Sequence, residues 1–175
     1  RLAGEPLAIV DDTPGTTRDR LLSEGEWSGI PFFIVDTGGI DPSEGGRTPL
    51  SVGSAEFIEE IRSQAEIAIQ EADVVLFVVD AISGVTPADR EVAQILRRSQ
   101  QIRDGSPYPP VLLVVNKADG AGLRSSAPEF FELGMGEPHP ISAVHGTGTG
   151  DLLDVLVESF PRGSRRKMIQ SRLPL

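Results

Sequence analysis

Two uninterrupted apolar runs, 74–79 and 111–115, constrain the fold of this chain more than any other feature. Each run ends in a polar residue, Asp80 for the first and Asn116 for the second. Strands that are apolar throughout are typical of sheets that helices cover on both faces, and such sheets are mostly parallel. Because a helical pattern separates the two runs, the sequence predicts an α/β fold with a mostly parallel sheet.

The other predicted elements complete this fold. Apolar residues at helical spacing predict helices over 54–71, from Thr86-Pro87 through Leu96, near 127–133 and over 150–160. A brief strand is expected at 139–141. Two extended runs around a Gly/Pro turn predict a β-hairpin over 21–36, which adds one antiparallel edge strand to the sheet. We expect one domain over residues 1–160 and an interdomain linker or tail over 161–175.

The charge balance argues against broad nucleic-acid binding. The chain has 26 acidic and 16 basic residues, a net charge of −10, and so negative a surface binds phosphate backbones poorly. The local exception is the basic stretch 162–167, which we interpret as a solvated tail, with a contact to RNA or a neighbouring domain as the alternative. No apolar run reaches the roughly 18 residues of a membrane span. The absence of cysteine is compatible with a cytoplasmic location.

The tetrapeptide Asn116-Lys117-Ala118-Asp119 directly follows the second apolar run. A carboxylate in this N-K-x-D arrangement can accept two N–H bonds from the edge of guanine, which adenine does not offer. A lysine stem can lie over the purine face, and an asparagine can tie neighbouring loops together. Discrimination through such pairing is steep, because the wrong base leaves a buried acceptor unpaired. Asn116, Lys117 and Asp119 are therefore the predicted guanine-reading residues.

Three further features follow strands or lie in polar loops. A D-x-x-G motif spans 36–39, where Asp36 can hold a water of a Mg²⁺ shell and the N–H of Gly39 can reach a terminal phosphate. The hydroxyl of Thr17 can serve the same metal, and the small turn Ser142-Ala143 lets backbone N–H groups approach a purine carbonyl. Each feature alone is more often an ordinary turn. Their order along the chain favours a nucleotide site, because ligands of open α/β sheets bind at the carboxyl ends of strands.

These strings, together with 13–19, 133–138 and 141–146, resemble the first GTPase domain of the Der (EngA) family, within the translation-factor class of GTPases. The resemblance covers roughly residues 1–160. It implies a three-layer P-loop NTPase fold like that of small GTPases, GTP and GDP as ligands, and GTP hydrolysis. It also implies a cytoplasmic parent protein that acts in assembly of the large ribosomal subunit. A second GTPase domain and a C-terminal RNA-binding-like domain are expected in that parent.

The resemblance also implies roles at matching positions. Thr17 would bind Mg²⁺ in switch I, Asp36 would be the metal partner in switch II, and Gly39 would sense the γ-phosphate. Thr17 and Gly39 are thus the predicted catalytic residues. Ser142 and Ala143 would lie behind the guanine that Asn116, Lys117 and Asp119 read.

The sequence departs from the family in the phosphate-binding motif, because no G-x-x-x-x-G-K-S/T occurs in it. In the family this loop and the first strand precede the position of Arg1, so we expect an N-terminally incomplete domain that binds nucleotide poorly as it stands. Ile40 occupies the place where many small GTPases keep a water-positioning glutamine, so we expect slow hydrolysis by the protein alone. The resemblance implies that a K⁺ ion near the phosphates assists, and the backbone carbonyls of 11–16 would surround it.

Two other functions compete with GTP hydrolysis as interpretations of the sequence. A non-catalytic module that binds guanine nucleotide, or only a protein partner, is the alternative that Ile40 and the missing phosphate loop favour. A dinucleotide-binding oxidoreductase is excluded, because no G-x-G-x-x-G follows a strand.

Overall fold

The computed structural model describes residues 22–35, 63, 66 and 69–161 of the chain. Its centre is a three-stranded parallel sheet in the order β3-β6-β7, formed by β3 (Val75–Asp80), β6 (Val111–Asn116) and β7 (Pro138–Pro140). The two long strands coincide with the apolar runs, and β7 lies one residue before the predicted brief strand. The predicted α/β fold with a mostly parallel sheet is therefore confirmed.

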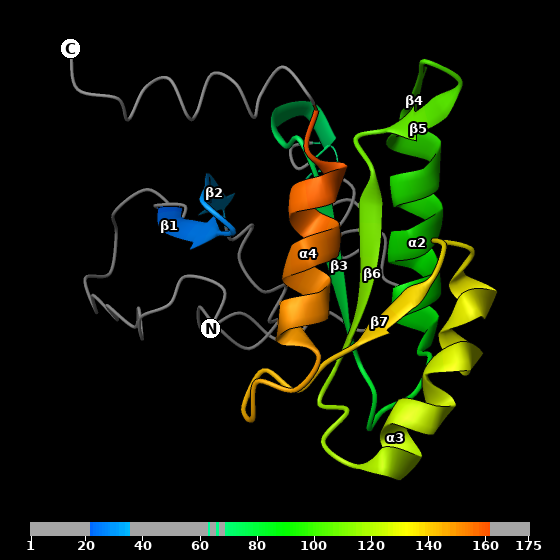
Figure 1. Cartoon of the computed structure of the whole chain (residues 1–175). Coiled ribbons are helices and arrows are strands. Elements are labelled where there is room, and N and C mark those ends of the chain that lie inside the picture. Colours follow the sequence, from blue (N-terminus) through cyan, green and yellow to red (C-terminus); the bar gives the residue numbers. More distant parts are fainter. Residues whose placement is uncertain (1–21, 36–62, 64–65, 67–68, 162–175) are drawn as a thin grey trace, which may run out of the picture.

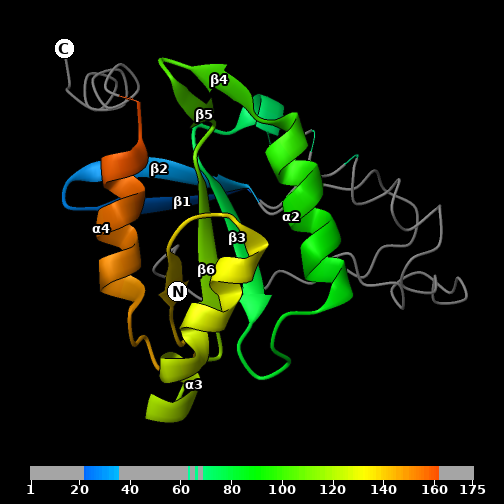
Figure 2. The same ribbon diagram turned by 90° about the vertical axis from the view of Figure 1, so that its right-hand side faces the viewer.

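Helices cover both faces of this sheet, as Figure 1 and Figure 2 show. Helix α2 (Pro87–Ser99) and the 3-10 helix η1 (Ala127–Leu133) pack on one face, and α4 (Thr149–Ser159) packs on the other. Successive residues of a strand point to opposite faces, so Phe77 joins the core beneath α2 while Leu76 packs toward α4. The structure therefore has three layers, with helix, sheet and helix in that order.

The predicted hairpin is present as β1 (Leu22–Trp27) and β2 (Ile30–Val35). Ser28 and Gly29 both have left-handed backbone angles, with φ of 50° and 74°, as a two-residue hairpin turn requires. The side chain of Phe32 is buried, and the centre of its ring lies 5.9 Å from that of Phe160. The indole N–H of Trp27 donates to the Asp154 carboxylate at 2.6 Å. In the described part of the chain the two strands pair only with each other, so their place at the edge of the parallel sheet stays a prediction.

Helix α2 begins where the Thr86-Pro87 signal predicts. The hydroxyl of Thr86 accepts from the Asp89 amide at 3.2 Å, and the Asp89 carboxylate accepts from the Thr86 amide at 2.8 Å. This reciprocal capping box satisfies two backbone donors that would otherwise have no partner at the start of the helix.

Replacing Thr86 by alanine is expected to lower the free energy of unfolding by about 1 kcal/mol, because the Asp89 amide loses its acceptor. Thr86→Ser keeps the hydroxyl and is expected to change that free energy by less than about 0.5 kcal/mol. Urea unfolding of the two variants beside the unsubstituted protein measures both values. Equal losses in the two variants would contradict a capping role.

Three elements were not predicted from the sequence. A short hairpin, β4 (Gln101–Arg103) and β5 (Ser106–Tyr108), turns through Asp104-Gly105, a dipeptide that is itself a hairpin signal. Helix α3 (Ala121–Ser126) precedes η1 and has no buried residue, so it lacks the apolar stripe by which helices are recognised. The helix predicted near 127–133 is present, but as a 3-10 helix.

Several predicted segments fall wholly or partly outside the described residues. Of the helix predicted over 54–71, the structure describes 63, 66 and 69–71, and all of these are helical. The D-x-x-G motif and the polar loop that contains Thr17 lie outside the description, as does the basic stretch 162–167. Among the helices of the described residues, none has the length and apolar character that crossing a membrane requires.

Candidate functional site

The predicted base-reading residues lie at the carboxyl edge of the parallel sheet. Asn116 ends β6 and is paired in register with Asp80, which ends β3, while Ser142 follows closely after β7. Three neighbouring strand ends therefore deliver polar residues to one edge, where open α/β sheets bind their ligands. The structure brings together the predicted residues Asn116, Lys117, Asp119, Ser142 and Ala143. The other three predicted site residues, Thr17, Asp36 and Gly39, lie outside the described residues.

Asn116 connects the loops that follow these strands. Its side-chain oxygen accepts from the Lys117 amide at 2.8 Å and from the Ala143 amide at 3.1 Å. Its backbone carbonyl accepts from the Ala81 amide at 2.8 Å. One residue thus bonds to the segments after β3, β6 and β7, which agrees with the predicted tying role. The Ala143 amide, expected to approach a purine carbonyl, already has a protein acceptor in this structure.

The turn after β7 is held tightly by its own hydrogen bonds. Ser142 is fully buried, its hydroxyl accepts from the His145 amide at 3.1 Å, and its own amide donates to the Thr147 carbonyl at 2.9 Å. The Ala118 amide donates to the Ile141 carbonyl at 2.9 Å, which joins this turn to the N-K-x-D loop. Ser142 therefore serves as an internal support of the turn, and its hydroxyl is not presented at the surface.

Gly148 is the other residue on which this turn depends. It has φ of 73°, and a Cβ added there would collide with the carbonyl oxygen of Pro140, just before the turn. Gly136 also has a left-handed backbone, with φ of 87°, but open space around it. Both glycines thus have a backbone conformation that disfavours a side chain, but only at Gly148 would a side chain also collide with a neighbouring atom.

Gly148→Ala is expected to lower the free energy of unfolding by about 1–3 kcal/mol more than Gly136→Ala, because only the first adds a collision to the backbone strain. Denaturant unfolding of both variants checks this difference. Equal effects would mean that the chain around Pro140 relaxes freely and does not hold the turn in place.

Lys117 has an unusual backbone and a fixed side chain. Its φ of 63° is left-handed, a conformation that residues other than glycine adopt rarely and mostly where function or tight packing demands it. Its ammonium lies 2.6 Å from one carboxylate oxygen of Asp80, whose other oxygen accepts from the Ile82 amide at 2.7 Å. The hydrogen bond from Lys117 lowers the pKa of the Asp80 carboxyl below its ordinary value of 3.8, although desolvation opposes it.

Asp80 is the site residue that sequence reasoning missed. Along the chain it has no neighbours that suggest a metal or acid–base site. The available signal was its place at the end of an apolar run, in the same position as Asn116 at the end of the next one. Only the strand order β3-β6 makes these two ends adjacent.

Asp119 presents a carboxylate that is available for a ligand. The residue is exposed, and among the described residues its side chain makes no hydrogen bond or ion pair. The loop beneath it is supported, since Ala118 is fully buried and its carbonyl accepts from the Arg124 guanidinium at 3.3 Å. An ionised carboxylate on a fixed loop can accept two parallel N–H bonds from a flat ring edge.

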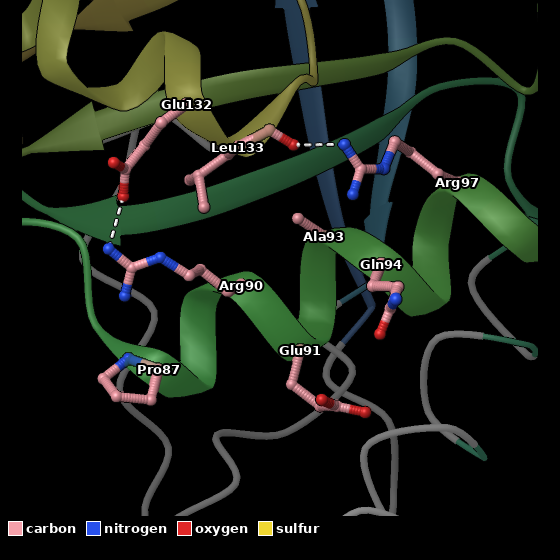
Figure 3. Close-up of a pocket in the computed structure, with 8 residues that line it drawn as sticks. All are labelled: Pro87, Arg90, Glu91, Ala93, Gln94, Arg97, Glu132 and Leu133. Atoms are coloured by element: carbon pink, nitrogen blue, oxygen red, sulfur yellow. Dashed lines mark hydrogen bonds and ion pairs between the residues drawn. The ribbon is translucent and has the colours of Figure 1, made fainter.

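The cavity shown in Figure 3 is not part of this edge. It lies between α2 and η1, and its lining includes none of the predicted site residues. Its two guanidinium groups already bind protein oxygens, Arg90 the Glu132 carboxylate at 2.6 Å and Arg97 the Leu133 carbonyl at 3.0 Å. This cavity is therefore not the candidate nucleotide site.

No cluster of metal-ligating side chains occurs within the described residues. The residues predicted for Mg²⁺, Thr17 and Asp36, lie outside that part of the chain. The structure therefore describes the residues predicted for the base, and those predicted for the phosphates are known from the sequence alone.

Known proteins resemble this chain over most of its length. A family model described as 50S ribosome-binding GTPase matches residues 1–117. GTPase Der of Levilactobacillus brevis is 49% identical over 161 residues, which are 92% of this chain and 33% of that protein. GTPase Der of Limosilactobacillus fermentum is 51% identical over 160 residues, 91% of this chain and 32% of that protein. GTPase Der of Geobacillus kaustophilus is 48% identical over 163 residues, which are 93% of this chain and 33% of that protein.

These matches confirm the likeness to the Der family that the motifs indicated. The chain spans about a third of the length of the curated relatives it matches, so the likeness concerns only that part of those proteins. Since the family model covers well over half of the sequence, from Arg1 to Lys117, the chain belongs to the family of 50S ribosome-binding GTPases.

Proposed function

We propose that this chain is the GTP-binding and GTP-hydrolysing switch domain of a bacterial GTPase that acts in assembly of the large ribosomal subunit. The observation that carries the proposal is the supported N-K-x-D loop at the carboxyl edge of the sheet, with Asn116 bonded to Ala143 and the Asp119 carboxylate exposed. Family membership and the Der relatives support the same reading.

Recognition of the base follows from the chemistry of these side chains. The Asp119 carboxylate accepts from the ring N–H and the exocyclic amino group of guanine, and adenine lacks this pair of donors. The amide nitrogen of Asn116, which has no partner among the described residues, is available to donate to a ring nitrogen of the purine. Ser142 holds the turn at the back of the base, and the Lys117 stem covers its face.

The phosphate end of the site is proposed from the sequence. Thr17 and Asp36 would hold Mg²⁺, which neutralises charge on the phosphates, and the Gly39 amide would contact the γ-phosphate. Loss of that phosphate on hydrolysis would release the loops around Thr17 and Gly39, which makes the domain a switch. Backbone carbonyls of 11–16 would surround a K⁺ ion near the phosphates.

The proposal is tested with two proteins, residues 1–175 alone and a longer one in which a phosphate-binding loop precedes Arg1. We expect the longer protein to bind a fluorescent GDP analogue and to release phosphate from GTP, faster in KCl than in NaCl. Equal turnover in the two salts would remove the potassium role alone. Binding without turnover would favour the non-catalytic alternative, for which Ile40 is the observation. No binding of guanine nucleotide would overturn the proposal.

The further domains and the ribosomal partner of the parent protein are also proposed from the family. The parent protein would carry a second GTPase domain and a C-terminal RNA-binding-like domain, and the large ribosomal subunit would bind the whole protein in the cytoplasm. Co-sedimentation of the full-length protein with large subunits, in GTP and in GDP, tests this. Binding that did not depend on the nucleotide would argue against a switch.

A further inference from the structure

We propose that Asp80 is a positioning residue for guanine binding, which holds Lys117 so that the lysine stem lies ready across the face of the base. The inference rests on the nucleotide binding proposed above and assigns a role to a residue outside the N-K-x-D motif. It is carried by the contacts that fix both ends of the Lys117 side chain.

The carboxylate of Asp80 is itself held in place. One of its oxygens accepts from the Ile82 amide at 2.7 Å, in the turn that directly follows β3. The other oxygen therefore faces a fixed direction, and the Lys117 ammonium lies 2.6 Å from it. Because Asp80 pairs in register with Asn116, the anchor stands one strand away from the loop that carries the lysine.

The backbone end of Lys117 is fixed as well. Its amide donates to the Asn116 side chain at 2.8 Å, and the next amide, that of Ala118, donates to the Ile141 carbonyl at 2.9 Å. The backbone of Lys117 is left-handed, with φ of 63°, and its ammonium reaches the Asp80 carboxylate at the end of β3. The four-carbon stem is thus held between β6 and the end of β3.

A stem fixed at both ends favours binding of a flat ring. A free lysine samples many rotamers and loses that freedom when a base packs against it, whereas a lysine that is already held loses less. The pair contributes little to folding, because its side chains are 54% and 31% exposed and exposed ion pairs stabilise weakly. A role in ligand binding therefore explains the geometry better than a role in stability does.

The test uses the longer, nucleotide-binding protein and the variant Asp80→Asn, which keeps the shape of the side chain and an acceptor for Ile82 but removes the charge. We expect about threefold to fivefold weaker binding of a fluorescent GDP analogue, with a faster dissociation rate and an unchanged melting temperature. Asp104→Asn, the same exchange in the β4–β5 turn, is the matched control and should bind GDP normally.

A double-substitution cycle separates positioning from other effects. Lys117→Met keeps an apolar stem without the ammonium, so adding Asp80→Asn to it should change GDP affinity by less than twofold. An undiminished effect in that background would overturn the role, as would unchanged GDP affinity in Asp80→Asn alone. A fall in melting temperature that accounts for the weaker binding would also overturn it. Failure of the unsubstituted protein to bind GDP would instead overturn the proposed function and this inference together.

Discussion

Replacing Asp119 by asparagine is expected to weaken binding of GDP by about 100-fold or more in the nucleotide-binding protein. The carboxylate that accepts two N–H bonds becomes an amide, which offers one acceptor and places a donor against a donor. Sites built on such pairing discriminate steeply between bases. The backbone of the loop should not change, because the bonds that support it involve Asn116, Ala118 and Arg124 and not the Asp119 side chain.

The same variant is expected to favour xanthosine nucleotides, since xanthine carries an oxygen where guanine carries its amino group. Titration of fluorescent GDP and XDP analogues against Asp119→Asn and the unsubstituted protein measures the exchange of preference. Asp104→Asn, on the exposed β4–β5 hairpin, removes the same charge away from the site and should keep the preference for GDP. Selectivity that is the same in all three proteins would remove the assignment of guanine to this loop.

Phe130→Ala is expected to lower the free energy of unfolding by about 3–5 kcal/mol, the largest change in stability that we predict. Its side chain is 1% exposed and packs in the core cluster with residues of α2, β3 and β6. Removing the ring takes away its burial and leaves a cavity that neighbours on three elements cannot all fill. Since η1 follows directly on the N-K-x-D loop and α3, we also expect weaker nucleotide binding near the new melting temperature.

The adjacent residue provides a matched control. Phe131 has the same side chain, but it is 54% exposed. Phe131→Ala should therefore change the free energy of unfolding by less than about 1 kcal/mol. Urea unfolding of the two variants gives the comparison, and equal losses would show that Phe130 does not hold η1 against the sheet.

The parts of the fold that could be predicted have strong local signals. The apolar runs gave β3 and β6, Thr86 and Pro87 gave the start of α2, and the apolar spacing over 150–160 gave α4 to within a residue. Helix α3 was not predicted because Leu123 is its only large apolar residue and none of its residues is buried. The β4–β5 hairpin escaped notice because Ile102 is the only large aliphatic residue in either strand, so no alternation is visible.

The candidate site divides in the same way. The residues proposed to read a base could be named from the N-K-x-D string and its place after a strand, since that chemistry depends on residue type and local spacing. Asp80 could not be identified in this way, because the role proposed for it depends on Lys117, which lies 37 positions away along the chain. The hydrogen bond from the Ala143 amide to the Asn116 side chain could not be predicted either, since it depends on how closely the turn after β7 approaches the end of β6.

The sequence by itself determined the class of fold, the ends of its main strands and the group of residues suited to guanine. Periodicity, helix caps and motifs involve residues that are close together along the chain, so they can be recognised without the tertiary structure. Only the tertiary structure decided which strand ends are neighbours, in the order β3-β6-β7. That order brings the Asp80 carboxylate to the Lys117 ammonium and the Asn116 side chain to the turn after β7. Hydrogen bonds and ion pairs act over a few ångströms, so they follow proximity in space and not separation along the chain.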